Sequence, residues 1–537
     1  MRCSRLAAIA LLIVVLPGSG HSFTDEEIDA AAQAARDIDI VEVIAADVFA
    51  GRAASTPGSF AVQELLIDAL SEVAQGLDAS QIGDDAYRQP FVISGVAGTN
   101  LLGVIPGTDL AHEYVMVGAH YDHLGSSGTM IFNGATDNAA GVAVVLAVGS
   151  AVRALPSPPR RSIILALWDA EEFGLLGSQA YRAAPLVPLS STVAYLNMDI
   201  QGANLLPSLR NRSFAIGAES GGAALRALVA EAVARQAVDA RQATRIVGQE
   251  RSDHATFIDS IPSVFFTDAT GACYHTPEDK IGVVDKRKLS EQAQIVFRAA
   301  LALSETPTPP PLSPTSPSFA TATYGDAVEL SSVATTALAD LDLFPLGSQT
   351  TLLGAEATLR NVVDAGPGMF DFFAILDVVF STLDLLQALG TVECDGHILV
   401  EPLEIDIKPG TSLNPLNLGS HGVVPVAILG SETLDVGQID PTTLAFGPGR
   451  ANPKHKVSGH VEDVDGDGLM DLVSHYRTQE TAIALGDDSA CVSAELLDGT
   501  RAEGCDAVQP QIPGACGVGF ELGAIVGPLL WLRRRRK

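Results

Sequence analysis

The sequence is short of positive charge. Lysine and arginine number 33 against 64 aspartates and glutamates, which gives a formal net charge of −31 at pH 7. Such a surface repels nucleic acid phosphates and anionic lipid, so we expect neither as a partner. The same acidity suits a protein that lives outside the cell and binds cations.

Long apolar runs are scarce as well. The run Leu6–Leu16 has eleven residues, too few to span a bilayer. It follows Arg2 and Arg5, and Gly20 and Ser22 offer small residues before a cleavage point. Residues 1–22 therefore predict an export signal, with a buried N-terminal helix as the alternative. We expect an exported protein that is periplasmic, cell-surface or extracellular.

Cysteines are few for a chain of 537 residues, which has six of them. Cys3 would leave with the signal and Cys516 belongs to the tail, so the body keeps Cys273, Cys394, Cys491 and Cys505. An exported protein can oxidise its cysteines. Cys491 and Cys505 are close in sequence and are the favoured pair, although sequence alone leaves the connectivity open.

The length predicts two or three domains, and 47% hydrophobic with 18% charged residues indicates a globular chain. Between residues 23 and 305 short apolar runs alternate with helical patterns. We expect strands at 114–119, 162–167, 194–198 and 263–267, and helices at 61–74, 139–155 and 222–235. This alternation predicts an α/β fold, a mostly parallel mixed sheet with helices on both faces.

Different compositions follow this first domain. Residues 306–318 are rich in proline and predict a linker, and 319–393 form an uncertain helical region. The apolar stretch 369–389 is interrupted by Asp371, Asp377 and Asp384, which favours a packed amphipathic helix over a membrane span. Short strands with many turns predict a small all-β module at 394–508.

The tail at 509–537 ends in GACGVGFELGAIVGPLLWLRRRRK. A short apolar run that meets a basic end resembles bacterial C-terminal sorting signals, and basic residues hold such a tail on the cytoplasmic side. We expect a tether to the membrane or cell envelope. The alternative is an ordinary frayed terminus.

Five places near the ends of predicted strands carry polar residues that could act together. They are His120 with Asp122, Asp137 with Asn138, Glu171 with Glu172, Asp199, and His275. Each has an ordinary interpretation when taken alone, such as a helix N-cap for Asp137 or a solvated turn for the two glutamates. Ligand sites in α/β sheets lie at the carboxyl ends of strands, so we expect the five places to meet.

Together these places supply two histidines and several acids. Zinc accepts both ligand types, and two metal ions a few ångströms apart can activate one water. A carboxylate that does not bind metal is needed to take the proton of that water. The inventory predicts a hydrolase with two metal ions.

The sequence motifs around these residues point to a specific protein family. GAHYDHLG, GATDNAAGVA, ALWDAEEFGLLGS, NMD, RSDHATFIDSIPSVFF and YHTPED occur in this order, and FAGRAASTPGS and NLLGVIPG precede them. The chain from residue 23 to about 305 resembles the co-catalytic zinc exopeptidases related to bacterial leucyl aminopeptidase and aminopeptidase Y. The resemblance implies a zinc-dependent aminopeptidase that acts on peptide or protein substrates.

The resemblance also implies a role for each residue. His120 and Asp199 would hold one Zn²⁺, and Glu172 and His275 would hold the other. Asp137 would bridge the two ions, and the peptide bond that joins it to Asn138 is often cis in such enzymes. Asp122 would orient His120, and Glu171 would be the general base that passes its proton to the leaving amine. One departure is Gln249, which stands three residues before Ser252 where some relatives have a tyrosine that polarises the substrate carbonyl.

Three other functions stay open. A glutaminyl cyclase has the same fold but uses one zinc, which the retention of both His120 and Asp199 disfavours. A carboxypeptidase or dipeptidase of the same superfamily is poorly separated by sequence. An inactive surface-binding protein is disfavoured because all five ligands and Glu171 are present.

The C-terminal module has a second metal candidate. Asp463, Asp465, Asp467 and Asp471 occupy positions one, three, five and nine of a loop with glycine at six. This spacing resembles the start of a Ca²⁺ loop, although Ser474 stands at position twelve instead of glutamate. We expect Ca²⁺ there, with a solvated acidic turn as the alternative. The module resembles a β module of other exported bacterial proteins, for which scaffolding or surface attachment is plausible.

Overall fold

The computed structural model describes residues 23–36, 38–248, 251–313, 319–344, 346–368, 372–387, 400–411, 414–431, 434–454, 459–487, 489–497 and 501–511. They form two compact units with the boundary between residues 397 and 398. The predicted export signal, Gln249, Cys3, Cys394, Cys516 and residues 512–537 of the predicted tail lie outside the described residues.

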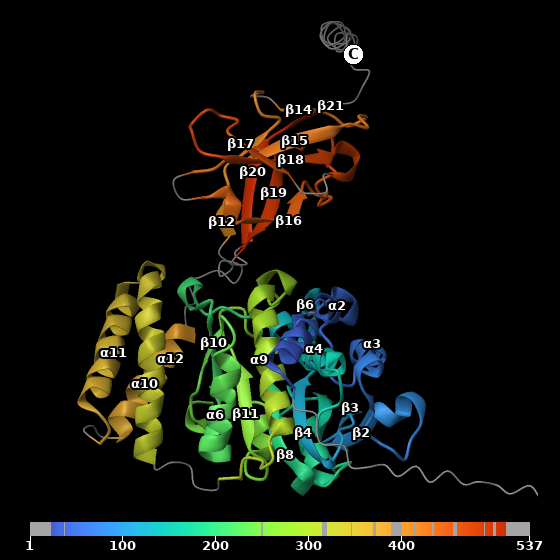
Figure 1. Ribbon diagram of the computed structural model, residues 1–537, viewed down its shortest axis with the longest axis vertical. Helices are drawn as coiled ribbons and strands as arrows, with labels where there is room; N and C mark the ends of the chain where they lie inside the picture. The colour runs from blue at the N-terminus through green and yellow to red at the C-terminus, as the bar shows by residue number, and fades with distance from the viewer. Residues whose placement is uncertain are drawn as a thin grey trace, which may run out of the picture. The chain divides into compact units, whose positions relative to one another are not determined.

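A mixed sheet forms the centre of the first unit (Figure 1). Within the described residues its order is β1-β3-β7-β4-β8-β11-β9-β10, with β2 on β3. The strands are β1 (Gln75–Gly76), β2 (Arg88–Ile93), β3 (Val96–Ile105), β4 (Leu110–His120), β7 (Arg161–Trp168), β8 (Thr192–Met198), β9 (Arg212–Ile216), β10 (Asp239–Arg241) and β11 (Ser263–Thr267). Strands β7, β4, β8 and β11 are mutually parallel neighbours, whereas β3 and β9 flank them in antiparallel pairing. The predicted α/β class is confirmed, and its parallel part is the centre of the sheet.

Successive side chains of the central strands point to opposite faces of the sheet. In β4, Val115 and Val117 belong to one buried cluster and Met116 to another. The first cluster is covered by α1 (Asp25–Ala32), α2 (Ile40–Ile44), α3 (Pro57–Val73), α4 (Ala140–Ala154), α6 (Gly222–Val233) and α9 (Lys286–Glu305). Tyr181 of α5 (Leu176–Ala183) and Phe257 of α8 (His254–Phe257) lie in the second. Helices therefore cover both faces, because every central strand is apolar on both sides.

The apolar helix α4 lies inside this unit. Within the described part of the chain, the stretch 135–154 is long and apolar enough to cross a membrane by length and composition, but 94% of its window is buried in the fold. We interpret it as a core helix, since the core helix of a soluble protein has the same composition.

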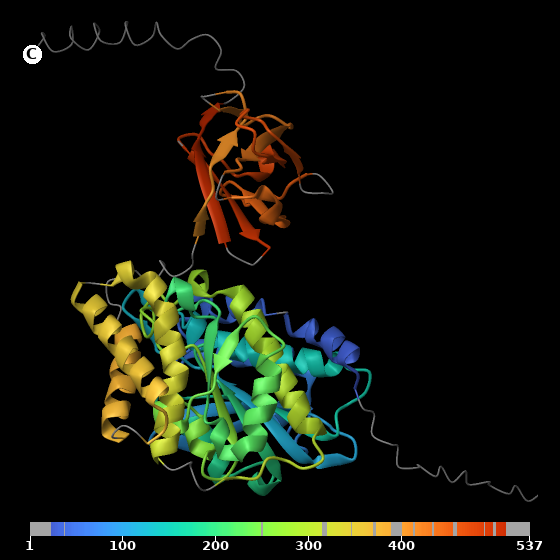
Figure 2. The ribbon, with the colours of Figure 1, turned by 60° about the vertical axis from the view of Figure 1, so that its left-hand side comes forward.

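Three more helices pack on the β9 side of the sheet (Figure 2). They are α10 (Phe319–Ala337), α11 (Leu346–Ala365) and α12 (Phe372–Gln387). Their apolar residues share one cluster with Phe214, Ile216 and Phe265 of the sheet. Asp326 also accepts hydrogen bonds from the backbone nitrogen and hydroxyl of Thr244, at 2.8 and 2.7 Å. The first unit thus continues past the Pro-rich segment.

Helix α12 is the packed amphipathic helix that the sequence predicts. Ile375, Val379 and Leu383 are buried in the shared cluster, while Asp377 and Asp384 are exposed. Asp371 lies outside the described residues.

The second unit is all-β over its described residues. One sheet has the order β12-β20-β19-β16, another β13-β15-β18-β17, and β14 pairs with β21. The strands are β12 (Val400–Pro402), β13 (Ile405–Ile407), β14 (Pro415–Asn417), β15 (Val423–Ile428), β16 (Ile439–Phe446), β17 (His460–Glu462), β18 (Asp471–Arg477), β19 (Ser489–Leu496), β20 (Arg501–Ala507) and β21 (Gln509–Gln511). Phe446, Tyr476 and Val492 are fully buried between them.

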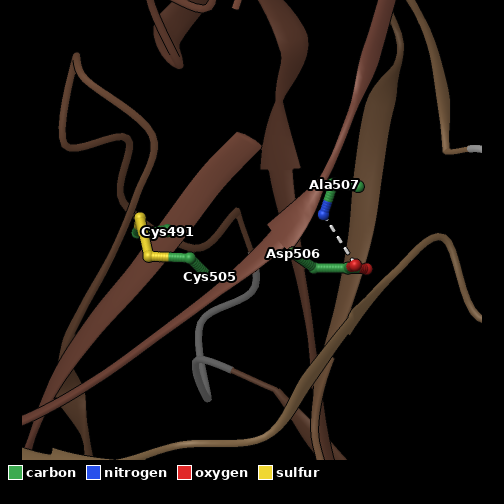
Figure 3. The surroundings of a disulfide bond; sticks show 4 residues. All are labelled: Cys491, Cys505, Asp506 and Ala507. Carbon is green, nitrogen blue, oxygen red and sulfur yellow. Dashed lines mark hydrogen bonds between the residues drawn. A yellow bond between two sulfur atoms is a disulfide. The ribbon is translucent and has the colours of Figure 1, made fainter. Parts of the chain in front are cut away.

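A disulfide joins two neighbouring strands of this unit (Figure 3). Cys491 of β19 and Cys505 of β20 face each other in register, with Cα atoms 4.0 Å apart and a sequence separation of 14. This confirms the favoured pair. Cys273 of the first unit is also disulfide-bonded.

Candidate metal centre

The central parallel strands deliver the predicted residues to one place. His120 is the last residue of β4, Glu171 and Glu172 follow β7, and Asp199 follows β8. His275 lies in the loop after β11. Because β7, β4, β8 and β11 are parallel neighbours, their carboxyl ends meet at the same edge of the sheet.

Asp137 lies at the centre of the group. Its Oδ1 is 3.3 Å from Nε2 of His120, and its Oδ2 is 3.2 Å from Nε2 of His275. The Asp137–Asn138 peptide bond is cis, as the resemblance implies. The structure therefore places one carboxylate between the two imidazoles.

Each imidazole has a second carboxylate beside it. Oδ1 of Asp199 lies 3.2 Å from Nε2 of His120, and Oε2 of Glu172 lies 3.3 Å from Nε2 of His275. The five ligands predicted from the sequence thus form two groups that share Asp137.

The donor spacing fits two zinc ions. Ligands at roughly 2.0–2.1 Å from a tetrahedral zinc are separated from one another by about 3.3 Å. The four contacts made by Nε2 of His120 and Nε2 of His275 measure 3.2 to 3.3 Å. Nitrogen and carboxylate donors are also the ligand types that zinc prefers, so both groups suit the ion that the resemblance implies.

Hydrogen bonding in this cluster shifts two pKa values strongly. Burial alone would raise the pKa of Asp137, but contacts from His120 and His275 hold it well below its usual range. Burial lowers the pKa of His275, but Asp137 and Glu172 outweigh this effect and raise it to about 10. Metal binding must displace such a proton, so loading of the site depends on pH.

Glu171 lies beside two of the predicted metal ligands, and donor atoms of Glu171, His120 and Asp199 are within 4.8 Å of one another. Its Oε2 is 4.0 Å from Nε2 of His120, a longer distance than the ligand contacts, and its side chain is only 11% exposed. Burial raises the pKa of Glu171 well above its usual range; His120 opposes this rise, and Asp199 adds to it. A carboxyl with a raised pKa beside a metal site has the properties of a general base that later acts as an acid.

Asp122 contacts more than His120. Its Oδ1 lies 3.6 Å from Nδ1 of His120, and that nitrogen is closer, at 3.1 Å, to the backbone oxygen of Asp122. The carboxylate accepts hydrogen bonds from the backbone nitrogens of Glu171, at 3.0 Å, and Glu172, at 3.3 Å. Asp122 therefore also fixes the turn that carries the two glutamates.

His123 is a site residue to which sequence reasoning assigned no role. It is fully buried, and its Nδ1 lies 2.8 Å from Oε1 of Glu172 and 3.9 Å from Oδ2 of Asp137. Donor atoms of these three residues lie within 4.8 Å of one another. The signal was present in the word HYDHLG, where a second histidine follows Asp122 directly.

Two further residues brace the loop of Asp137. Asp279 of YHTPED accepts hydrogen bonds from the backbone nitrogens of Thr136, at 2.9 Å, and Asp137, at 3.1 Å. Arg52 is fully buried and donates to the backbone oxygens of Ile44, Tyr121, Asn133 and Gly134. Burial lowers the pKa of Arg52 to about 10, against the attraction of the nearby carboxylates.

Tyr274 borders the same site. Its ring stacks on the ring of His275, with centroids 3.8 Å apart. Burial raises the pKa of Tyr274, and the negative charges of Asp137 and Asp199 add to the shift.

The acidic loop of the second unit brings together three of its four predicted residues. Carboxylate oxygens of Asp463, Asp465 and Asp471 lie within 4.8 Å of one another. Asp471 is fully buried and accepts hydrogen bonds from the backbone nitrogens of Gly430 and Val464. Asp467 lies outside this group and accepts from the backbone nitrogen of Leu469.

Comparison with known proteins relates part of the first unit to a peptidase family. Residues 100–300 match the model of Peptidase family M28. The M28 match begins in β3 and contains every predicted zinc ligand.

Curated relatives match only part of the chain. Aminopeptidase NAALADL1 of Mus musculus is 40% identical over 107 residues, 19% of this chain and 13% of that protein. Probable glutamate carboxypeptidase LAMP1 of Arabidopsis thaliana is 40% identical over 104 residues, 19% and 14% of the two chains. Leupeptin-inactivating enzyme 1 of Streptomyces exfoliatus is 35% identical over 127 residues, 24% and 27%. The chain thus spans less than a third of the length of these relatives.

Solved structures resemble the chain more distantly. The LapA aminopeptidase of Legionella pneumophila is 18% identical, with 55% of this chain and 79% of that chain covered and a TM-score of 0.43. A zinc aminopeptidase of Bacillus subtilis is 23% identical, with 40% and 52% covered and a TM-score of 0.33. A glutaminyl cyclase of Porphyromonas gingivalis is 19% identical, with 51% and 97% covered and a TM-score of 0.39.

Proposed function

We propose that the first unit is a two-zinc aminopeptidase that removes residues from the N-termini of peptides. The arrangement of His120, Asp199, Glu172 and His275 around the shared carboxylate of Asp137 carries this proposal. Two zinc ions in such a site supply Lewis acidity, which makes a water nucleophilic at neutral pH and stabilises developing negative charge.

The chain's own residues would then handle the protons. Glu171 accepts the proton of the attacking water and donates it to the departing amine, a role for which burial and a raised pKa prepare it. Asp122 accepts hydrogen bonds from the backbone nitrogens of Glu171 and Glu172, which holds the turn that carries the base and the ligand.

The test uses the chain from Phe23 onward. Bound zinc is measured together with hydrolysis of a panel of aminoacyl chromogenic amides, for the wild type, Glu171→Gln and Glu172→Gln. We expect near two zinc per chain in the wild type and a loss in kcat of about 100-fold or more for Glu171→Gln with the metal retained. Glu172→Gln is the matched control next in sequence, and it should lose metal as well as activity.

Other outcomes would replace the proposal. N-blocked peptides with a free C-terminus and peptides that begin with glutamine are included, because the relatives include glutamate carboxypeptidases and a glutaminyl cyclase. Release of the C-terminal residue, or cyclisation of glutamine, would move the function to one of those activities. A folded chain that binds no zinc would contradict the enzyme and favour a surface-binding protein.

We also propose that the chain is exported and tethered through its tail. The N-terminal charges and apolar run support export, and the apolar run with a basic end supports the tether. Cell fractionation and the N-terminal sequence of the mature protein test both. A mature chain that begins at Phe23 in an envelope fraction, released when residues 512–537 are deleted, is expected; an uncleaved chain would contradict export.

A further inference from the structure

A pocket opens beside the proposed zinc site in the first unit. Its volume is about 80 Å³, and its lining includes Asp199, a predicted zinc ligand, and Tyr274, whose ring stacks on His275. The pocket therefore lies directly beside the proposed zinc site.

The walls of this pocket come from two parts of the chain. Ile216 and Phe265 of the sheet are buried, and each is at most 6% exposed. The opposite wall is helix α12, which contributes Phe380 and Leu383. Helix α12 lies beyond residue 300, where the M28 match ends.

Helix α12 is fixed firmly in this position. The hydroxyl of Thr270, in the loop after β11, donates a hydrogen bond of 2.9 Å to Oε1 of Gln387. Leu383 and its buried neighbours on α12 belong to the same cluster as Phe265. The wall is thus part of the packed core of the first unit, which gives the pocket a defined size.

The pocket is apolar inside and charged at its solvent side. Apart from Asp199, its buried lining is mainly aliphatic and aromatic, and the other charged lining residues, Arg251 and Asp384, are exposed. The pocket's volume is several times the roughly 10–15 Å³ that one water needs, so the pocket can hold a medium-sized side chain. A leucine, methionine or phenylalanine side chain has this size, and a charged side chain would lose hydration inside.

We propose that this pocket binds the side chain of the substrate's N-terminal residue and that α12 sets its size limit, so that medium-sized apolar residues are preferred. The inference rests on the proposed aminopeptidase activity. It gives α12, the last of the three helices that follow the Pro-rich segment, a role in specificity.

The experiment compares three variants of the chain from Phe23 onward. Leu383→Trp fills the pocket, and Phe380→Ala enlarges it. Ser381→Trp places the same large ring at an exposed position on α12 and is the matched control. The readout is kcat/KM for alanyl, leucyl, phenylalanyl and lysyl amides, with Tm as a check on folding.

We expect Leu383→Trp to lower kcat/KM for the leucyl and phenylalanyl amides about tenfold or more, relative to the alanyl amide. Phe380→Ala should shift preference toward phenylalanyl amide, and Ser381→Trp should leave every ratio unchanged within about twofold. If Leu383→Trp does not fold, the proposal is tested by the change in the ratio of kcat/KM values between amides in Phe380→Ala. Equal losses for all substrates in both folded variants would overturn the proposal.

Failure of the pocket and failure of the enzyme are distinguishable. If the wild type cleaves alanyl amide but the ratios do not respond to the variants, only the pocket proposal falls. If the wild type cleaves no aminoacyl amide, the proposed aminopeptidase activity is wrong. Calorimetric binding of L-leucine to the wild type and to Leu383→Trp then tests whether the pocket binds an apolar side chain. Equal binding, or none, would overturn it.

Discussion

Nδ1 of His123 lies 2.8 Å from Oε1 of Glu172, while the other carboxylate oxygen of Glu172 faces His275. Both atoms are buried, and neither makes a hydrogen bond within the described residues. The two oxygens of the Glu172 carboxylate therefore have different neighbours. Oε2 faces the proposed metal, and Oε1 faces the imidazole of His123. We therefore predict that His123 positions Glu172.

This contact predicts that His123→Ala weakens metal binding. Outer partners of metal ligands contribute about 10- to 100-fold in metal affinity, so zinc or cobalt should bind more weakly by that factor. Asn carries a polar group near the position of Nδ1 and should restore much of the affinity, whereas Gln reaches toward Nε2 and should not. Cobalt(II) titrations followed by the visible absorption spectrum measure this; equal affinity in all four proteins would contradict the role.

Arg52 should contribute strongly to stability. Arg52→Met removes the guanidinium donor from four buried backbone oxygens, although that of Gly134 still accepts a hydrogen bond from the backbone nitrogen of Ala139. The change should lower the free energy of unfolding by at least about 3 kcal/mol. Arg52→Lys keeps the charge and should cost less. Arg88→Met is the control, because Arg88 pairs with the exposed Glu64 at 2.7 Å and such pairs contribute about 0–1 kcal/mol. Denaturant unfolding compares them, and equal losses at the two arginines would contradict the prediction.

His254 should make the first unit sensitive to acid. Burial lowers its pKa to about 3, and Arg245 adds to this shift. The ring stacks on Phe265 with centroids 4.5 Å apart, and its nitrogens make no hydrogen bond within the described chain. An unfolded histidine takes up a proton near pH 6.5, so its contribution to stability is present above that pH and is lost as the pH falls from about 6.5 toward 3.

The loss of stability at acid pH can be measured against His254→Phe, because phenylalanine does not titrate. Between pH 7.5 and 5.5 the wild type should lose about 1.4 kcal/mol of unfolding free energy relative to this variant. His112→Phe makes the same replacement at an exposed position and should show no such difference. If the unfolding free energies of the wild type and His254→Phe change with pH in parallel, the prediction is wrong.

Calcium should stabilise the second unit. At a concentration of 100 Kd, a bound ion adds about 2.7 kcal/mol to the unfolding free energy. Asp465→Asn should remove this increase, because Asp465 belongs to the converging group. Asp467→Asn should weaken it less, since Asp467 lies outside that group. Calorimetric unfolding with and without Ca²⁺ provides the measurement, and an unchanged Tm on Ca²⁺ addition would favour the solvated turn.

Much of the active-site chemistry could be predicted from local patterns. Strand 263–267 was predicted with its observed bounds, because short runs buried on both faces have an unmistakable composition. The candidate residues could be named because they lie near the ends of predicted strands, and parallel strands bring their carboxyl ends together. Their roles as ligands and base came from the resemblance to the co-catalytic zinc exopeptidases. The cysteine pair 491–505 was found because its members are close in sequence.

The sequence by itself determined the α/β class, the identity of the candidate ligands and the base, and the all-β character of the C-terminal unit. Only the tertiary structure decided what His123, Arg52 and α12 do. Their partners lie 49, 81 and up to 117 residues away along the chain, as in His123 with Glu172, Arg52 with Asn133, and Gln387 with Thr270. Periodicity and spacing report on neighbours within one element, whereas these contacts arise from packing between distant segments, which no local pattern encodes.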